Sequence, residues 1–131
     1  MRFTGQFDRF NRPVITVYIL FPSIHAEGNI DFLVDTGADG TTLNLQDATA
    51  IGIDVSSLIQ NGQSRGVGVA PKFPVETAGT LLFTADDGST KLPVSHPSVI
   101  VLKNVSYSLL GRDVMRLFKL YMNKSSVYLE T

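Results

Sequence analysis

The hydrophobic and polar residues of this chain alternate mainly as they do in short β-strands. Residues 2–8 alternate along their whole length, as in a strand with one covered face. Residues 13–21 (PVITVYILF) are rich in β-branched and aromatic side chains, which favour strands. Residues 29–35 (NIDFLVD) are nearly continuous in apolar side chains, so we expect a strand that is covered on both faces. A final alternation in residues 126–130 predicts one more strand.

Glycine, proline and aspartate mark the turns between these strands. A long hairpin is expected over residues 61–85, with three glycines near its first half. Asp86-Asp87-Gly88 predicts a tight hairpin turn, because Asp-Gly supplies the positive φ angles that such a turn needs. Residues 92–102 are predicted to form a strand that Pro93 and Pro97 restrict to an edge or irregular position.

Helical patterns are few. Residues 46–52 predict a short helix that a glycine ends, and residues 112–118 predict a second one. Many short strands with one or two short helices predict an all-β fold, a closed or sandwich-like β-barrel. The chain has 131 residues, a typical length for one domain, so we expect residues 1–131 to form a single domain.

Composition excludes several classes of partner. The chain is 44% apolar with a formal net charge of −1, so it is expected to fold and shows no basic footprint for nucleic acid. The longest apolar run, residues 14–21, is too short to span a bilayer, so no membrane partner is expected. A signal-peptide core is the alternative for this run, but its β-branched residues and the following Pro22 favour a strand. The absence of cysteine excludes disulfides and fits a reducing compartment, so a cytoplasmic location is the expectation.

One acidic residue stands where an acid is costly. Asp35 ends an apolar strand and is followed at once by Thr36 and Gly37. A buried carboxylate must be hydrogen-bonded or must share a proton. Gly37 has no side chain, so its N–H can approach that carboxylate closely, and the Thr36 hydroxyl can hold the loop against a neighbour. The structural alternative is an acid that only ends the strand and caps a turn.

The sequence motifs give little support for a metal-dependent enzyme or for a cysteine nucleophile. Asp35, Asp39 and Gly40 match positions 1, 5 and 6 of a calcium loop, but Gly37 and Gln46 stand where ligating oxygens belong. The chain lacks a cysteine nucleophile and a His-Glu-x-x-His zinc pattern. No metal site and no cofactor are therefore predicted.

The two histidines are isolated in the sequence. His25 and His96 both lie beside turn residues, so both are expected at the surface.

Three segments together resemble one protein family. Residues 32–43 (FLVDTGADGTTL) resemble the active-site loop of the retropepsins, the retroviral-type aspartic proteases. Gly66-Val67-Gly68-Val69 is similar to the glycine-rich tip of that family's flap hairpin. Residues 108–113 (SLLGRD) resemble the apolar-apolar-glycine element that threads beside the family's active-site loop. In the family's order, these matches span roughly residues 10–130.

The resemblance implies an aspartic endopeptidase that needs no metal. Its catalytic residue would be Asp35, and because the chain has a single Asp-Thr-Gly, a second Asp35 must come from an identical subunit of a homodimer. Gly111 and Arg112 would brace the active-site loop, Arg112 through an ion pair with Asp39. The loop itself would comprise Thr36, Gly37, Ala38 and Asp39.

The resemblance also implies how a substrate would bind. A polypeptide would lie extended, and Val67 and Val69 between their glycines would close over it. Pro71 and Pro74 depart from the plain strand of a regular retroviral flap. The alternative function is a non-catalytic module that keeps the fold for dimerisation or peptide binding.

Overall fold

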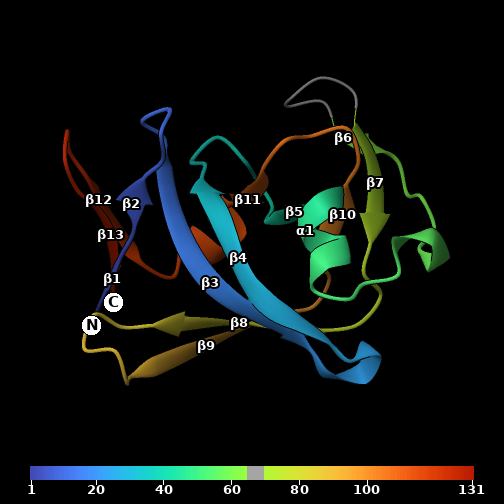
Figure 1. Ribbon diagram of the computed structural model, residues 1–131, viewed down its shortest axis with the longest axis horizontal. Coiled ribbons are helices and arrows are strands. Elements are labelled where there is room, and N and C mark those ends of the chain that lie inside the picture. Colours follow the sequence, from blue (N-terminus) through green and yellow to red (C-terminus); the bar gives the residue numbers. More distant parts are fainter. Residues whose placement is uncertain (65–69) are drawn as a thin grey trace.

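The computed structural model describes residues 1–64 and 70–131 (Figure 1). Most elements are strands, which form one sheet of three strands and one of ten. The predicted all-β class is confirmed. Within the described residues neither sheet closes on itself, so the expectation of a closed barrel is wrong.

Two long strands form the centre of the larger sheet (Figure 1). Strand β3 (Pro13–Phe21) has the predicted bounds and pairs antiparallel with β4 (Ala26–Val34). The short β2 (Gln6–Phe7) pairs with the beginning of β3. The expectation that β4 is covered on both faces is wrong, because its exposed Asn29 and Asp31 alternate with buried residues. Only one face of this strand pair packs against the core.

The other half of this sheet is built from short strands: β5 (Thr42–Asn44), β6 (Gln63–Ser64), β7 (Ala70–Pro74), β10 (Ile100–Leu102) and β11 (Ser108–Leu110). Strand β11 lies between β4, to which it is parallel, and β5, to which it is antiparallel. This order brings the end of β4, the beginning of β5 and the residues after β11 to one place.

Strands β8 (Gly79–Thr84) and β9 (Lys91–His96) form a hairpin across the predicted Asp-Gly turn, where Gly88 has a φ of +79°. The predicted hairpin over residues 61–85 is present only in part: β6 and β7 pair antiparallel, but its extension to residue 85 is wrong. Strand β7 pairs with β6 and β10, whereas β8 pairs with β3 and β9. The strand predicted over residues 92–102 is two strands. β9 lies at the sheet edge and ends before Pro97, as the prolines predict, whereas β10 lies inside the sheet between β7 and β5.

The smaller sheet joins the two ends of the chain. Strand β13 (Val127–Glu130) lies between β1 (Arg2–Thr4) and β12 (Lys119–Met122). The two termini are adjacent (Figure 1), and the Met1 ammonium donates to Thr131 Oγ1 at 3.0 Å. Strand β12 is absent from the sequence-based predictions.

The helices are short. Helix α1 (Leu45–Ala50) is capped by Asn44, whose side chain accepts a hydrogen bond from the Asp47 N–H. Helix α2 (Arg112–Met115) is a single turn and ends before the predicted residue 118. The described residues also include two 3₁₀ turns, η1 (Pro22–Ile24) and η2 (Val55–Ser57). None of the described helices has the length and apolar character needed to cross a membrane.

Both sheets contribute to one apolar core. Phe3 of the smaller sheet packs edge-on against Phe83 of β8, with ring centroids 5.8 Å apart, and Phe118 contacts both rings. This aromatic cluster fixes the terminal sheet to the sheet that carries the Asp-Thr-Gly loop.

Candidate active site

The Asp-Thr-Gly segment forms a tight loop between β4 and β5. The Asp35 N–H donates to the Leu110 carbonyl at 3.1 Å, and the Ala38 N–H donates to the Asp35 carbonyl at 3.2 Å. The Gly37 N–H donates to Asp35 Oδ1 at 2.9 Å, which confirms the close approach expected of this glycine. This bond fixes the orientation of the Asp35 carboxylate within the loop.

In the single chain this loop is open to solvent. Asp35 is half-buried, and Thr36 and Gly37 are exposed. Within residues 1–64 and 70–131, Thr36 forms no side-chain hydrogen bond. The loop therefore presents a carboxylate and a free hydroxyl at the surface of the chain.

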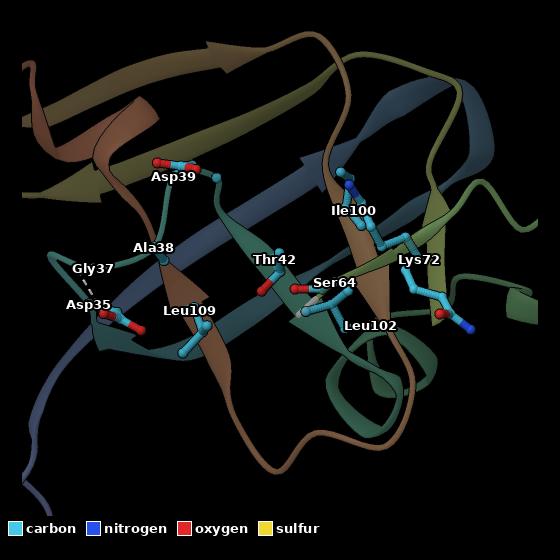
Figure 2. Close-up of a pocket in the computed structure, with 12 residues that line it drawn as sticks. Asp35, Gly37, Ala38, Asp39, Thr42, Ser64, Lys72, Ile100, Leu102 and Leu109 are labelled. Atoms are coloured by element: carbon cyan, nitrogen blue, oxygen red, sulfur yellow. Dashed lines mark hydrogen bonds between the residues drawn. The ribbon is translucent and has the colours of Figure 1, made fainter. Parts of the chain in front are cut away.

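Asp35 lies at the edge of a large open pocket of about 780 Å³. Figure 2 shows Asp35 at one side, Lys72 at the opposite side, and Leu109 and Thr42 between them. The pocket is lined by Asp35, Gly37, Ala38, Asp39, Gly40, Thr42, Gln63, Ser64, Lys72, Ile100, Leu102 and Leu109. One wall is thus the Asp-Thr-Gly loop, and the other consists of the β6–β7 hairpin and β10.

The segment after β11 supports the loop through backbone hydrogen bonds. The Arg112 N–H donates to the Ala38 carbonyl at 2.9 Å, and the Asp113 N–H donates to the Asp39 carbonyl at 3.2 Å. Gly111 is buried at the closest point, where a Cβ atom would lie 2.5 Å from the Gly40 carbonyl carbon. The predicted contact of Gly111 with the loop is therefore present, and it requires a residue without a side chain.

We expect Gly111→Ala to lower the free energy of unfolding by about 1–3 kcal/mol, because the added methyl group meets backbone that no side-chain rotation can clear. Urea unfolding measures this loss. The matched control is Gly40→Ala, since a Cβ atom at Gly40 has its nearest neighbour at 3.9 Å. Equal stability of the Gly111→Ala variant and the wild type would show that the loop moves freely away from this contact.

The predicted ion pair between Arg112 and Asp39 is formed. Its two side chains are 59% and 91% exposed, respectively. An ion pair this exposed contributes only about 0–1 kcal/mol in water. In the single chain, this pair is therefore a weak part of the support.

Asp113 makes the stronger support, which sequence reasoning missed. Its carboxylate accepts hydrogen bonds from the Thr41 N–H at 3.0 Å, the Thr41 hydroxyl at 2.7 Å, the Val114 N–H at 2.8 Å and His96 Nε2 at 2.7 Å. Burial alone would raise the pKa of Asp113, but the hydrogen bonds from His96 and Thr41 hold that pKa at about 2. The signal available in the sequence was the acid directly after Gly111-Arg112.

The expected surface position of His96 is wrong. Its side chain is only 13% exposed and lies against Asp113. His25 is exposed, as predicted. The difference arises because β9 ends beside α2, a contact between segments that are distant in the sequence.

Two further predictions concern ligands and the flap. The predicted flap tip, Gly66, Val67, Gly68 and Val69, lies outside the described residues. Among the residues that the structure describes, no group of three or more His, Cys, Asp or Glu side chains is arranged to hold a metal ion.

Two solved structures share this fold. A retropepsin-like aspartic protease from Rickettsia conorii aligns with a TM-score of 0.66 and 19% identity over 98% of this chain and 90% of that chain. The EIAV protease, solved in complex with the inhibitor HBY-793, aligns with a TM-score of 0.54 and 19% identity over 84% of this chain and 90% of that chain. These two likenesses show that the chain has the retropepsin fold.

A family model gives the same result from the sequence. The model for aspartyl proteases matches residues 23–114, which include the Asp-Thr-Gly loop and the segment that supports it. This chain belongs to the aspartyl protease family. No curated protein matches it closely in sequence.

Proposed function

We propose that this protein is an aspartic endopeptidase that works as a homodimer, with Asp35 of each copy forming one catalytic pair. The observation that carries the proposal is the position of Asp35: it borders the large pocket, accepts a hydrogen bond from the Gly37 N–H and lies in a loop that the single chain leaves open. Because the chain has one Asp-Thr-Gly, the second carboxylate must come from another copy.

Two carboxylates in contact cannot both ionise easily, so the pair shares one proton and titrates as a unit; aspartic proteases are themselves the standard example of this behaviour. The charged carboxylate accepts a proton from a water molecule, which attacks the peptide carbonyl carbon. The protonated carboxylate donates its proton to the carbonyl oxygen. This chemistry needs neither a metal nor a covalent intermediate.

The neighbouring residues have distinct roles in this proposal. Thr36, with its exposed hydroxyl, would hydrogen-bond to the second copy across the two-fold axis. Gly37 orients Asp35 through its N–H. The ion pair of Asp39 with Arg112 holds the outer part of the loop, and two charges so exposed are also accessible to a second copy.

The pocket suits an extended polypeptide. Its lining combines the apolar Ile100, Leu102 and Leu109 with the polar Ser64 and Lys72. Such a surface binds a strand-like peptide through backbone hydrogen bonds and admits alternate side chains. The predicted flap residues 66–69 connect β6 and β7, the two strands that form the wall opposite Asp35.

The dimer makes a direct kinetic prediction. The rate of peptide cleavage per subunit should rise with protein concentration and then level off, because only the dimer contains both carboxylates. The measurement uses a mixed peptide library at several pH values from about 4 to 7, with cleavage read by mass spectrometry.

Sedimentation of the same samples gives the dimer fraction. A constant rate per subunit while the dimer fraction changes would exclude the shared site. A folded dimer that cleaves no peptide at any pH would favour the non-catalytic peptide-binding module.

A further inference from the structure

His96 lies at the end of β9, and both of its ring nitrogens have partners. The Ser98 N–H donates to Nδ1 at 3.2 Å, and Nε2 lies 2.7 Å from Asp113 Oδ2. A nitrogen that accepts a hydrogen bond carries no proton, so the proton of the neutral ring is assigned to Nε2. Ser98 thereby selects the tautomer that donates to Asp113.

Asp113 connects His96 to the loop through hydrogen bonds of its own. Its carboxylate accepts both the N–H and the hydroxyl of Thr41, the residue that follows Gly40 at the end of the loop. The Thr41 hydroxyl in turn accepts from the Gly111 N–H at 3.1 Å, so its own proton is directed to Asp113. Every group around the carboxylate is therefore a donor, and each one fixes its orientation.

The contact of His96 is distinct from the others. Thr41 and Val114 belong to the loop and to α2, which already share backbone hydrogen bonds. His96 comes from a third element, and within the described part of the chain its bond to Asp113 is the one hydrogen bond between β9 and α2 or the loop. Without it, no hydrogen bond within the described part of the chain would join α2 or the loop to β9.

We infer that His96 is a positioning residue for Asp35. The loop is already joined to β11 through the bond from the Asp35 N–H to the Leu110 carbonyl. By donating to Asp113, His96 adds a second attachment, to the β8–β9 hairpin, and so restricts the remaining motion of the loop. The inference rests on the proposed function, in which a small displacement of Asp35 from its counterpart misplaces the shared proton and the attacking water. A displacement of about 1 Å in such a site can cost about 100-fold in rate.

The test compares four purified full-length proteins: wild type, His96→Ala, His96→Gln and His25→Asn. The Gln amide places a donor near the position of Nε2, so it can restore the bond to Asp113. His25 is the matched control, because it is exposed and its φ of +55° is one that asparagine tolerates. Two quantities are measured on each protein: kcat and KM with a cleaved peptide, and amide hydrogen exchange in residues 35–41.

We expect His96→Ala to lower kcat by roughly 10- to 100-fold, with KM changed less than about threefold, and to speed exchange of the Gly37 and Thr41 amides. His96→Gln should recover most of both losses, and His25→Asn should match the wild type. Unchanged kcat in His96→Ala, or a change confined to KM, would overturn the inference. So would equal losses in His96→Ala and His96→Gln.

Hydrogen exchange separates this inference from the proposed function. If the wild type cleaves nothing, the proposed function fails, and hydrogen exchange alone decides whether His96 orders the loop. Faster exchange in His96→Ala, with recovery in His96→Gln, would support the role of His96. Identical exchange in all variants would overturn that role. If His96→Ala does not fold, His96→Asn replaces it, because its shorter side chain does not reach Asp113.

Discussion

We expect Asp35→Asn to reduce peptide cleavage by roughly 10²–10⁴-fold while the protein remains folded and dimeric. The carboxamide has the shape of the carboxylate and still accepts from the Gly37 N–H, so the loop geometry is retained. It cannot take a proton from water or return one. Initial rates on a peptide identified as a substrate measure the loss, and circular dichroism checks the fold.

The matched control for this substitution is Asp31→Asn, four residues earlier on the same chain. Asp31 is exposed on β4 and accepts from the Thr16 hydroxyl, away from the loop. Its substitution should leave the rate within about twofold, as is usual for surface positions. Equal activity of Asp35→Asn and wild type would remove the catalytic role from Asp35.

Mixing the inactive variant with wild type tests the shared site more sharply. A pair with one carboxylate and one carboxamide lacks either the base or the acid, so mixed dimers should be inactive. When dimers form fully and at random, a ninefold excess of Asp35→Asn should reduce the activity of a fixed amount of wild type to about one tenth. No inhibition in a mixture shown to exchange subunits would contradict a dimeric site.

Local patterns predicted the parts of the fold that local physics determines. β3 has the predicted bounds because its run of β-branched residues ends at Pro22. The Asp-Gly turn after β8 could also be predicted from the sequence, since its positive φ is favoured by the residue type itself. The position of Gly37 beside Asp35 followed from the same local argument.

The remaining features depend on which distant segments meet. β8 pairs with β3 and β9, and nothing in residues 61–85 shows that the predicted hairpin ends with β7 and does not continue into β8. Apolar residues near the end of β4 suggested two covered faces, although Asp31 faces solvent. Tertiary packing determines both features, and the local pattern of a single sequence does not reveal that packing.

The support of the Asp-Thr-Gly loop shows the same limit. The sequence favoured Arg112 with Asp39, a pair of opposite charges that a motif makes visible. The stronger support is the partly buried Asp113, whose partners Thr41 and His96 are 72 and 17 residues away. An acid at a helix start gives no sign of such partners, because the same acid commonly caps its own helix.

We expect Asp113→Asn to lower the free energy of unfolding at neutral pH by about 2–3 kcal/mol, the largest stability loss predicted for this chain. The carboxylate accepts from four donors, two at each oxygen. A carboxamide of the same shape replaces one of these oxygens by an NH₂ group. This group is itself a donor, and it would face the two donors that the oxygen accepted from. At least one buried donor then loses its partner. Urea unfolding at pH 7 gives the difference, with Asp31→Asn as the exposed control.

The pH dependence identifies the cause of this loss. The pKa of Asp113 is lowered from 3.8 to about 2 in the folded chain, so its stabilisation is present in full above pH 4 and is lost as the pH falls through 2. That shift corresponds to roughly 2 kcal/mol. The stability gap between wild type and Asp113→Asn should therefore narrow between pH 4 and pH 2. A gap that stays constant over this range would assign the loss to packing instead of to the ionised carboxylate. Since the carboxylate stays charged above pH 4, the support of the loop persists wherever the Asp35 pair is expected to work.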